Sequence, residues 1–461
     1  MTDTTAAPAE LARRTADAMA AGAPPRATYR VQLNHAFTFD DAARIVPWLA
    51  RLGVSHLYCS PIFRAAPGSM HGYDVVDFGE INPELGGREG FDRLVEVVHS
   101  HDMKIMVDFV PNHMGIENGA NAWWQDVLEH GPASPYESYF DIDWTPLTEE
   151  LRNKVLLPVL GEQYGVVLER GELQLRYDAG AFTVWYWETP LPLAPATYPL
   201  LLRPVLERLA AELAAGDLDL LELESVINAL ERLPQLAEGT DPGALDARYR
   251  EQLVAKRRLA ELIDRSAPIR ESLDTELAAV NGDVGDPRSF DRLDGLLALQ
   301  PWRVAFWRVA GEEINYRRFF AINTLAAIRQ EEPLVFRATH RLLIELIASG
   351  AVDAVRIDHP DGLWDPRGYF HDLQAEAIAA CALFGQGIAP GAVHDEEHAE
   401  MLEAVRAEAR ALMLDGAAER QRWPLYVLAE KILEHGEALP DEWAIAGTVG
   451  YDFAFAATAV F

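Results

Sequence analysis

The hydrophobic positions of this chain form short runs that end in polar residues, with amphipathic stretches between them. The runs predict β-strands and lie at residues 27–33, 54–61, 104–113, 352–359 and 424–430. The amphipathic stretches follow the 3.6-residue period of helices, as at 39–53, 90–101 and 396–416. Strands that alternate with helices are typical of a parallel sheet with helical crossovers. The predicted fold is therefore α/β, a (β/α)8 TIM-type barrel.

A long segment interrupts this alternation after the third strand. It is too long for one crossover and too strongly patterned for a loop. Its first part is rich in aromatic and turn residues and predicts a β-rich subdomain, whereas its second part has the Leu-rich period of packed structural helices. The predicted divisions are a disordered tail at 1–26, barrel strands 1 to 3 at 27–113, a β-rich insert at 114–197, a helical insert at 198–300 and the continued barrel at 301–461.

The pattern of strands stops short of a closed barrel. Residues 444–455 are consistent with a sixth strand, and the chain ends at Phe461. A closed barrel of this type needs eight strands. We therefore expect an incomplete barrel with an open sheet edge, and a chain of this length to lack significant activity by itself.

The charge of the chain restricts the partners that it can bind. Its 461 residues include 72 acidic and 40 basic residues, a net charge of −32, and 49% are hydrophobic. This balance argues against nucleic acid or an anionic membrane as a partner. A neutral ligand fits better.

The N-terminus and the cysteines indicate a compartment. Residues 1–26 contain early acidic residues and no sustained apolar core, which argues against a secretory signal or a membrane span. Only Cys59 and Cys381 occur, too few for a disulfide framework and without the spacing of metal ligands. The expected localisation is cytoplasmic, with both thiols reduced.

Two carboxylates at predicted strand ends carry the candidate chemistry. Asp358 ends the run at 352–359, and Glu430 ends the run at 424–430. A nucleophile and a proton donor at such positions can break a glycosidic bond. Arg356, two residues before Asp358, would lie on the same strand face and lower the pKa of that carboxyl. The alternative is an ordinary structural ion pair.

Other polar groups are expected to join this pair. Asp108 and His113 close the third strand, where an imidazole can bind a sugar hydroxyl, although a lone His is usually structural. The loop at 71–74, with the sequence HGYD, adds an aromatic face and polar edges. Lys431 should point away from Glu430, so both a substrate contact and a structural pair remain open for it.

Three of these segments occur in a recognisable order. DFVPNH (108–113), VRIDH (355–359) and the AE that ends in Glu430 resemble the first three signature regions of the α-amylase superfamily, glycoside hydrolase family 13. Further segments resemble one branch of that superfamily and span nearly the whole chain, at 28–33, 60–77, 81–87, 307–320, 358–366 and 430–453.

The resemblance implies roles for the residues at these positions. Asp358 would be the nucleophile, Glu430 the acid/base, and Arg356 would assist catalysis. Substrate would be bound by His71, Tyr73, Asp74, Asp108, Asn112, His113, His359 and Lys431. No metal or cofactor is implied.

The closer branch implies an isomerase of trehalose biosynthesis. It would convert the reducing-end α-1,4 linkage of a maltooligosaccharide to an α,α-1,1 linkage by a retaining double displacement. Maltooligosyltrehalose trehalohydrolase would be its pathway partner. The released glucose must turn within the site before water arrives, so a covered pocket is implied, with the insertion and residues 314–320 as candidates for the cover.

Two departures from the pattern of that branch leave other functions open. Ala321 stands where an acidic residue is usual, and the chain ends before the fourth signature region, which supplies a third catalytic carboxylate. The alternatives are an α-glucan hydrolase of the same superfamily, which product analysis would separate, and an inactive truncated fragment.

Overall fold

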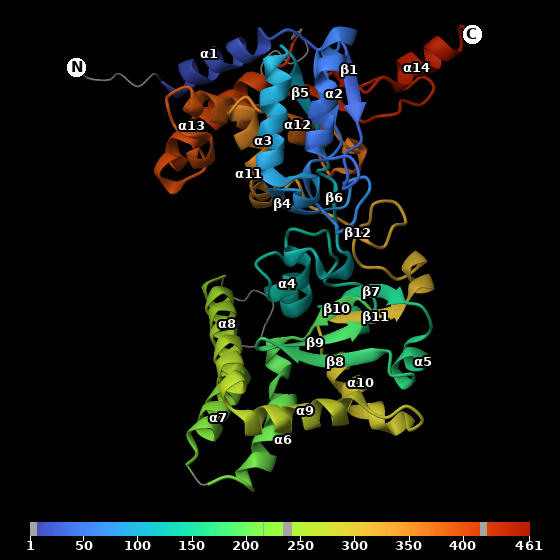
Figure 1. Cartoon of the computed structure of the whole chain (residues 1–461), viewed down its shortest axis with the longest axis vertical. Helices are drawn as coiled ribbons and strands as arrows, with labels where there is room; N and C mark the ends of the chain where they lie inside the picture. The colour runs from blue at the N-terminus through green and yellow to red at the C-terminus, as the bar shows by residue number, and fades with distance from the viewer. Residues whose placement is uncertain (1–6, 215, 234–241, 415–421) are drawn as a thin grey trace, which may run out of the picture. The chain divides into compact units, whose positions relative to one another are not determined.

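The computed structural model describes residues 7–214, 216–233, 242–414 and 422–461, which form two compact units. The first unit comprises Met1–Gly115 and Ala327–Phe461, and the second comprises Ile116–Ala326. The chain thus leaves the first unit once and returns to it (Figure 1). Strands β6 (His113–Gly115) and β12 (Leu325–Ala327) lie at these two crossings of the chain.

The first unit contains a parallel sheet of six strands in the described part of the chain. The strand order is β1-β2-β5-β13-β14-β15, and every neighbouring pair is parallel. The bounds are β1 Thr28–Val31, β2 His56–Cys59, β5 Lys104–Phe109, β13 Ala354–Ile357, β14 Tyr426–Ala429 and β15 Gly447–Thr448. The prediction of an incomplete (β/α)8 barrel is confirmed, including its short sixth strand.

Helices connect these strands as crossovers. They are α2 Phe39–Leu52, α3 Gly87–Ser100, α11 Pro333–Ala348, α12 Pro366–Phe384 and α13 Ala399–Leu414, with α14 Tyr451–Thr458 after the last strand. The hairpin of β3 (Phe63–Ala65) and β4 (Val75–Ile81) follows β2. Local signals begin and end α2, because Thr38 and Asp41 form a capping box and Gly53 ends the helix at a φ of 91°.

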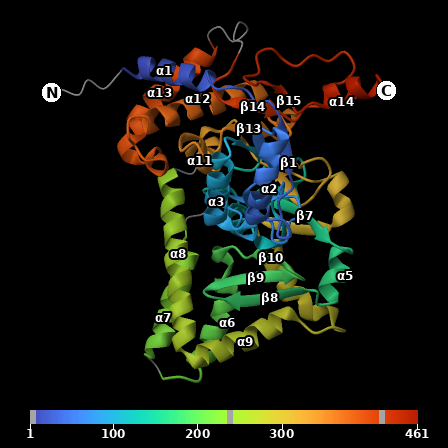
Figure 2. The same cartoon turned by 45° about the horizontal axis from the view of Figure 1, so that its top comes forward.

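The N-terminal segment is not a disordered tail at residues 8–20. These residues form α1 (Pro8–Ala20), which lies alongside α12 and α13 in both views (Figure 1 and Figure 2). Leu11, Ala12 and Ala16 are buried in this contact. An Ala-rich stretch has high helix propensity, and tertiary packing of one apolar face stabilises it further. The first six residues lie outside those that the structure describes.

The second unit has a β-rich first part and a helical second part, close to the predicted inserts. Its strands are β7 Val155–Leu160, β8 Leu173–Asp178, β9 Ala181–Tyr186, β10 Thr189–Pro192 and β11 Trp302–Phe306. Its helices are α4 Ala122–His130, α5 Tyr164–Glu169, α6 Pro199–Ala210, α7 Leu218–Glu231, α8 Pro242–Arg265, α9 Ala267–Asn281 and α10 Asp291–Ala298.

The predicted boundary at residue 301 was wrong. Residues 301–326 belong to the second unit and not to the continued barrel. The cause is strand pairing, because β11 pairs in parallel with β7 of the same unit. Periodicity identifies a strand without its partner, so the sequence could not locate this boundary.

Candidate active site

The two predicted catalytic carboxylates follow neighbouring parallel strands. Ile357 of β13 pairs with Ala429 of β14, and the amide of Glu430 donates to the carbonyl of Ile357 at 2.9 Å. Asp358 and Glu430 therefore stand next to each other at the carboxyl edge of the sheet. In parallel α/β barrels this is the edge at which catalytic groups gather.

Arg356 joins Asp358 to a second buried carboxylate, Asp108. Its Nη1 donates to Oδ1 of Asp108 at 2.7 Å and to Oδ1 of Asp358 at 2.6 Å. The sheet register explains this contact, because Arg356 is the partner of Asp108 across β13 and β5. Arg356 and Asp358 are only 7% and 8% exposed, and Asp108 is completely buried. One guanidinium nitrogen thus serves two carboxylates in a largely dry environment.

Burial has a larger effect on Asp358 than the adjacent cation has. It raises the pKa of Asp358 to about 6, while Arg356 acts in the opposite direction and Asp108 and Glu430 add to the rise. We predicted that Arg356 would lower this pKa. Its direction of action is as expected, but the net shift is upward because removal of a carboxylate from water disfavours its charged form.

Asp108 accepts hydrogen bonds from three side chains. Besides Arg356, the hydroxyls of Tyr73 and Tyr58 donate to its Oδ2 at 2.7 and 3.0 Å. Burial raises the pKa of Asp108, whereas Arg356 and both tyrosines act to lower it. Tyr73 comes from the loop between β3 and β4, so that loop contributes directly to the cluster at the strand ends.

Asn112 and His359 lie in the turns that follow β5 and β13, and His113 is the first residue of β6. Asn112 Nδ2 and His113 Nδ1 are 3.2 Å apart, and both residues are buried. His359 has a left-handed φ of 44° directly after Asp358. A Cβ at Gly362 would lie 2.3 Å from Oδ1 of Asn112 and 2.6 Å from Cδ2 of His359. A larger residue at position 362 would therefore have to displace the side chains of these two predicted substrate-binding residues.

The remaining predicted residues make contacts outside this cluster. Ser69 donates to Asp74 at 2.6 Å, and the half-exposed His71 accepts from the amide of Tyr73 at 3.1 Å. Lys431 Nζ lies 3.0 Å from Asp361 Oδ2 and 2.6 Å from Glu437 Oε1. Lys431 thus forms ion pairs with two acidic residues, and its contact with substrate stays a prediction.

Three further residues belong to the hydrogen-bond network around Asp108, and the sequence analysis did not identify them. Tyr58 donates to Asp108, and Arg30 Nη2 donates to the hydroxyl of Tyr73 at 3.1 Å. Gln32 accepts from Nη1 of Arg30 at 3.1 Å. Polar residues at alternate positions of a predicted strand were the available signal, because Arg30 and Gln32 repeat the spacing of Arg356 and Asp358.

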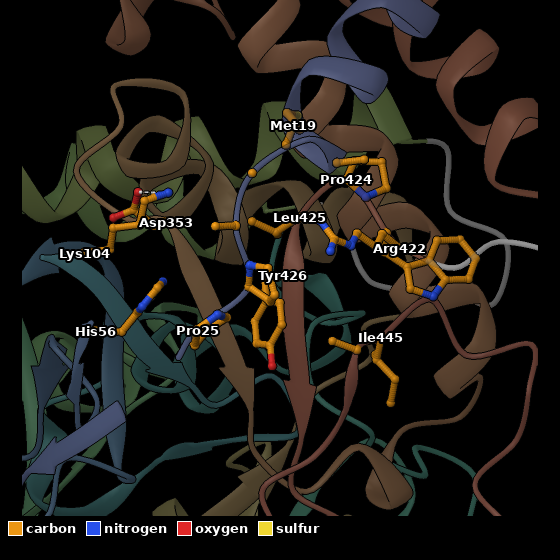
Figure 3. Close-up of a pocket in the computed structure, with 16 residues that line it drawn as sticks. Met19, Pro25, His56, Lys104, Asp353, Arg422, Pro424, Leu425, Tyr426 and Ile445 are labelled. Atoms are coloured by element: carbon orange, nitrogen blue, oxygen red, sulfur yellow. Dashed lines mark ion pairs between the residues drawn. The ribbon is translucent and has the colours of Figure 1, made fainter. Parts of the chain in front are cut away.

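A pocket of about 410 Å³ lies at the opposite end of the sheet (Figure 3). It is lined by the first residues of three strands, His56, Lys104 and Tyr426, and by Asp353 and Arg422. Lys104 and Asp353 form an ion pair of 3.5 Å there. This pocket contains none of the predicted catalytic groups, and the amino end of barrel strands usually serves stability. The catalytic assignment therefore rests on the carboxylates at the other end.

In the part of the chain that the structure describes, no group of three or more His, Cys, Asp or Glu side chains is arranged to hold a metal ion. Within the same residues, no helix has the length and apolar character needed to cross a membrane.

Comparisons with known proteins agree with the fold. The family described as alpha amylase, catalytic domain, matches residues 43–165. A putative maltooligosyl trehalose synthase of Mycobacterium tuberculosis is 33% identical over 357 residues, which are 76% of this chain and 33% of that protein. Intracellular maltogenic amylase of Bacillus subtilis is 41% identical over 103 residues, 22% of this chain and 17% of that protein.

A solved structure extends the likeness to nearly the whole chain. Maltooligosyltrehalose synthase from Arthrobacter ramosus has 31% sequence identity and a TM-score of 0.56, over 93% of this chain and 37% of that one. The chain thus spans about a third of the length of the maltooligosyl trehalose synthases that it matches. By sequence and by fold, the chain is similar to the catalytic domain of alpha amylases and, over most of its length, to maltooligosyl trehalose synthases.

Proposed function

We propose that this chain carries the catalytic pair of a transglucosylase that forms maltooligosyl trehalose. The observation that carries the proposal is the placement of Asp358 and Glu430 after adjacent parallel strands, with Asp358 bound to Arg356. The similarity to maltooligosyl trehalose synthases over 93% of the chain supports the choice of substrate.

In the first step, the carboxylate of Asp358 attacks the anomeric carbon next to the reducing-end glucose. The bond from that carbon to O4 of the terminal glucose breaks, and Glu430 gives its proton to the departing oxygen. The remaining maltooligosaccharide is then an ester of Asp358. Arg356 and the buried surroundings hold Asp358 in a fixed direction for this attack.

In the second step, the freed glucose turns and presents its anomeric hydroxyl. Glu430 accepts the proton of that hydroxyl, the oxygen attacks the anomeric carbon, and the ester bond to Asp358 breaks. Two displacements at the same carbon retain its α configuration, and the α-anomer of glucose as the acceptor supplies the second one, so the product has an α,α-1,1 linkage. The net reaction is an isomerisation in which water takes no part.

Hydrolysis is the alternative outcome of the same intermediate. The match of residues 43–165 to the general catalytic domain and the similarity to a maltogenic amylase favour it as the second candidate. It differs only in the second acceptor, because water would then replace the anomeric hydroxyl of glucose.

All activity measurements use the chain extended to the length of its synthase relatives, because the chain spans about a third of that length. Incubation of this extended protein with maltopentaose separates the two reactions. Transglucosylation should remove reducing ends without shortening the oligosaccharide, whereas hydrolysis should create a new reducing end with each cleavage. A reducing-end assay combined with carbohydrate chromatography measures both quantities. Shorter products and a rising number of reducing ends, with no non-reducing pentasaccharide, would exclude the transfer reaction as the main activity.

A further inference from the structure

Arg30 and Gln32 connect the first strand of the sheet to the loop that supplies Tyr73. Gln32 Nε2 donates to the backbone carbonyls of Met70 and His71 at 3.3 and 3.2 Å. Its Oε1 accepts from Nη1 of Arg30 at 3.1 Å. The pair therefore holds both the backbone of this loop and, through Arg30, the side chain of Tyr73. Neither residue takes part in the two chemical steps described above.

The contact between Arg30 and Tyr73 fixes the direction of the tyrosine hydroxyl. A guanidinium has donors and no acceptor, so at the distance of 3.1 Å the oxygen of Tyr73 must accept from Nη2. The hydroxyl hydrogen is then directed at Oδ2 of Asp108, 2.7 Å away. Because donors in such chains polarise one another, the bond to Asp108 is strengthened as well as oriented.

Arg30 also contacts the second tyrosine that binds Asp108. Its Cζ lies 5.5 Å from the ring centroid of Tyr58, and Cζ of Arg356 lies 5.9 Å from that of Tyr73. Each guanidinium is thus within the range of a cation–π contact with one of the two rings. Loss of Arg30 would affect both hydroxyl donors to Asp108.

We propose that Arg30 is a positioning residue for the reaction at Asp358. By holding the hydroxyl of Tyr73 on Asp108, it satisfies Oδ2 of that carboxylate and leaves Arg356 Nη1 shared between Asp108 and Asp358. Without Arg30, Arg356 would bind Asp108 more strongly, and its ion pair with Asp358 would weaken. This inference rests on the proposed function, since it assumes that Asp358 is the nucleophile.

The charged and titratable groups around Asp108 and Asp358 determine in which direction the loss of Arg30 shifts the protonation of Asp358. Arg356, Asp108 and Glu430 act on Asp358, and Tyr58, Tyr73 and Arg356 act on Asp108. Removal of the Arg30 cation and weaker sharing of Arg356 both favour the protonated form of Asp358. Arg30→Met should therefore move the acidic limb of the pH profile of kcat/KM to higher pH.

The test compares Arg30→Met, Tyr73→Phe and the double variant on maltopentaose, with all cleavage products counted. Arg30→Met should lower kcat/KM by about tenfold to a hundredfold, the cost of a misplaced catalytic group. If Arg30 acts mainly through the hydroxyl of Tyr73, the loss in the double variant should be clearly smaller than the product of the two single losses. A loss within twofold of the wild type, or losses that multiply in the double variant, would overturn the proposal.

Two further variants separate the positioning role of Arg30 from a general effect of removing a positive charge. Arg64→Met removes a cation from an exposed pair with Glu80 and should leave the pH profile unchanged. Arg30→Lys keeps a charged donor and should recover most of the lost activity; a lysine variant as slow as Arg30→Met would overturn the positioning role. Product identity tests the proposed transfer separately, because hydrolysis in place of transfer leaves the dependence on Arg30 measurable.

Discussion

Two buried carboxylate centres, one in each unit, have opposite ratios of acid to cation. In the second unit, Glu276 of α9 is 2% exposed and pairs with Arg208 of α6, at 3.0 Å, and with Arg292 of α10. In the first unit, the single guanidinium of Arg356 serves Asp108 and Asp358.

The difference separates a structural centre from the centre that we propose to be reactive. Two cations around one carboxylate give full compensation and connect three helices. One cation between two carboxylates leaves excess negative charge in a dry place, and the pKa of Asp358 rises to about 6. Such under-compensated groups are typical of catalytic sites, because their protonation can change during a reaction.

The largest expected effect is the loss of turnover in Asp358→Asn. The amide cannot form the glycosyl ester, so kcat should fall by roughly ten-thousandfold or more, as for other nucleophiles that act within a unit. Rates on maltopentaose and circular dichroism of the purified variant measure activity and folding. A folded variant with wild-type turnover would show that Asp358 is not the nucleophile.

The second unit should respond in stability and not in chemistry. Replacing both Arg208 and Arg292 by Met leaves Glu276 buried without compensation, which should cost about 3–5 kcal/mol in the free energy of unfolding. Glu276→Leu should cost less, because both arginine side chains are partly exposed and can turn to water. Urea unfolding measures the two costs. If Glu276→Leu is the more damaging change, the assignment of Glu276 as the compensated partner is wrong.

Glu430→Gln should slow the reaction strongly when the leaving group needs a proton and only slightly when it does not. Loss of a general acid typically costs a factor of about 100 or more on natural glucan. A glucosyl substrate with an acidic leaving group needs no proton to depart, so formation of its covalent intermediate should be nearly unaffected. Stopped-flow measurement of the released group tests this contrast. Equal losses on both substrates would exclude the acid/base role.

The smallest effect is the pH dependence of Asp358. Because the nucleophile must be ionised and its pKa is about 6, kcat/KM should fall about tenfold per pH unit below 6. The pKa in the folded protein lies above the ordinary 3.8, so this group's contribution to stability is present below pH 4 and is lost as pH rises to 6.

The variant Asp358→Asn is the control for this direction of the pH dependence of stability. The variant should become more stable relative to the wild type between pH 4 and pH 7, by at most about 3 kcal/mol. Unfolding free energies at the two pH values measure the difference. A variant that loses relative stability over this range would contradict the raised pKa.

The sequence by itself determined the order of the strands and the two strand-end carboxylates. Apolar runs that end in Asp358 and Glu430 are local patterns, since a buried parallel strand needs a continuous run and a catalytic group follows it. The contact between Arg356 and Asp358 could also be predicted from the sequence, because residues two apart on a strand share a face.

Only the tertiary structure decided which groups meet these carboxylates and how they are charged. Arg30 and Tyr58 contact the cluster from other strands. Helix α1 is stabilised by its contact with α12 and α13, and β11 pairs with β7. The pKa of Asp358 depends on burial among residues far apart in the chain. Pairing and desolvation arise from long-range contacts, which periodicity and residue type do not contain.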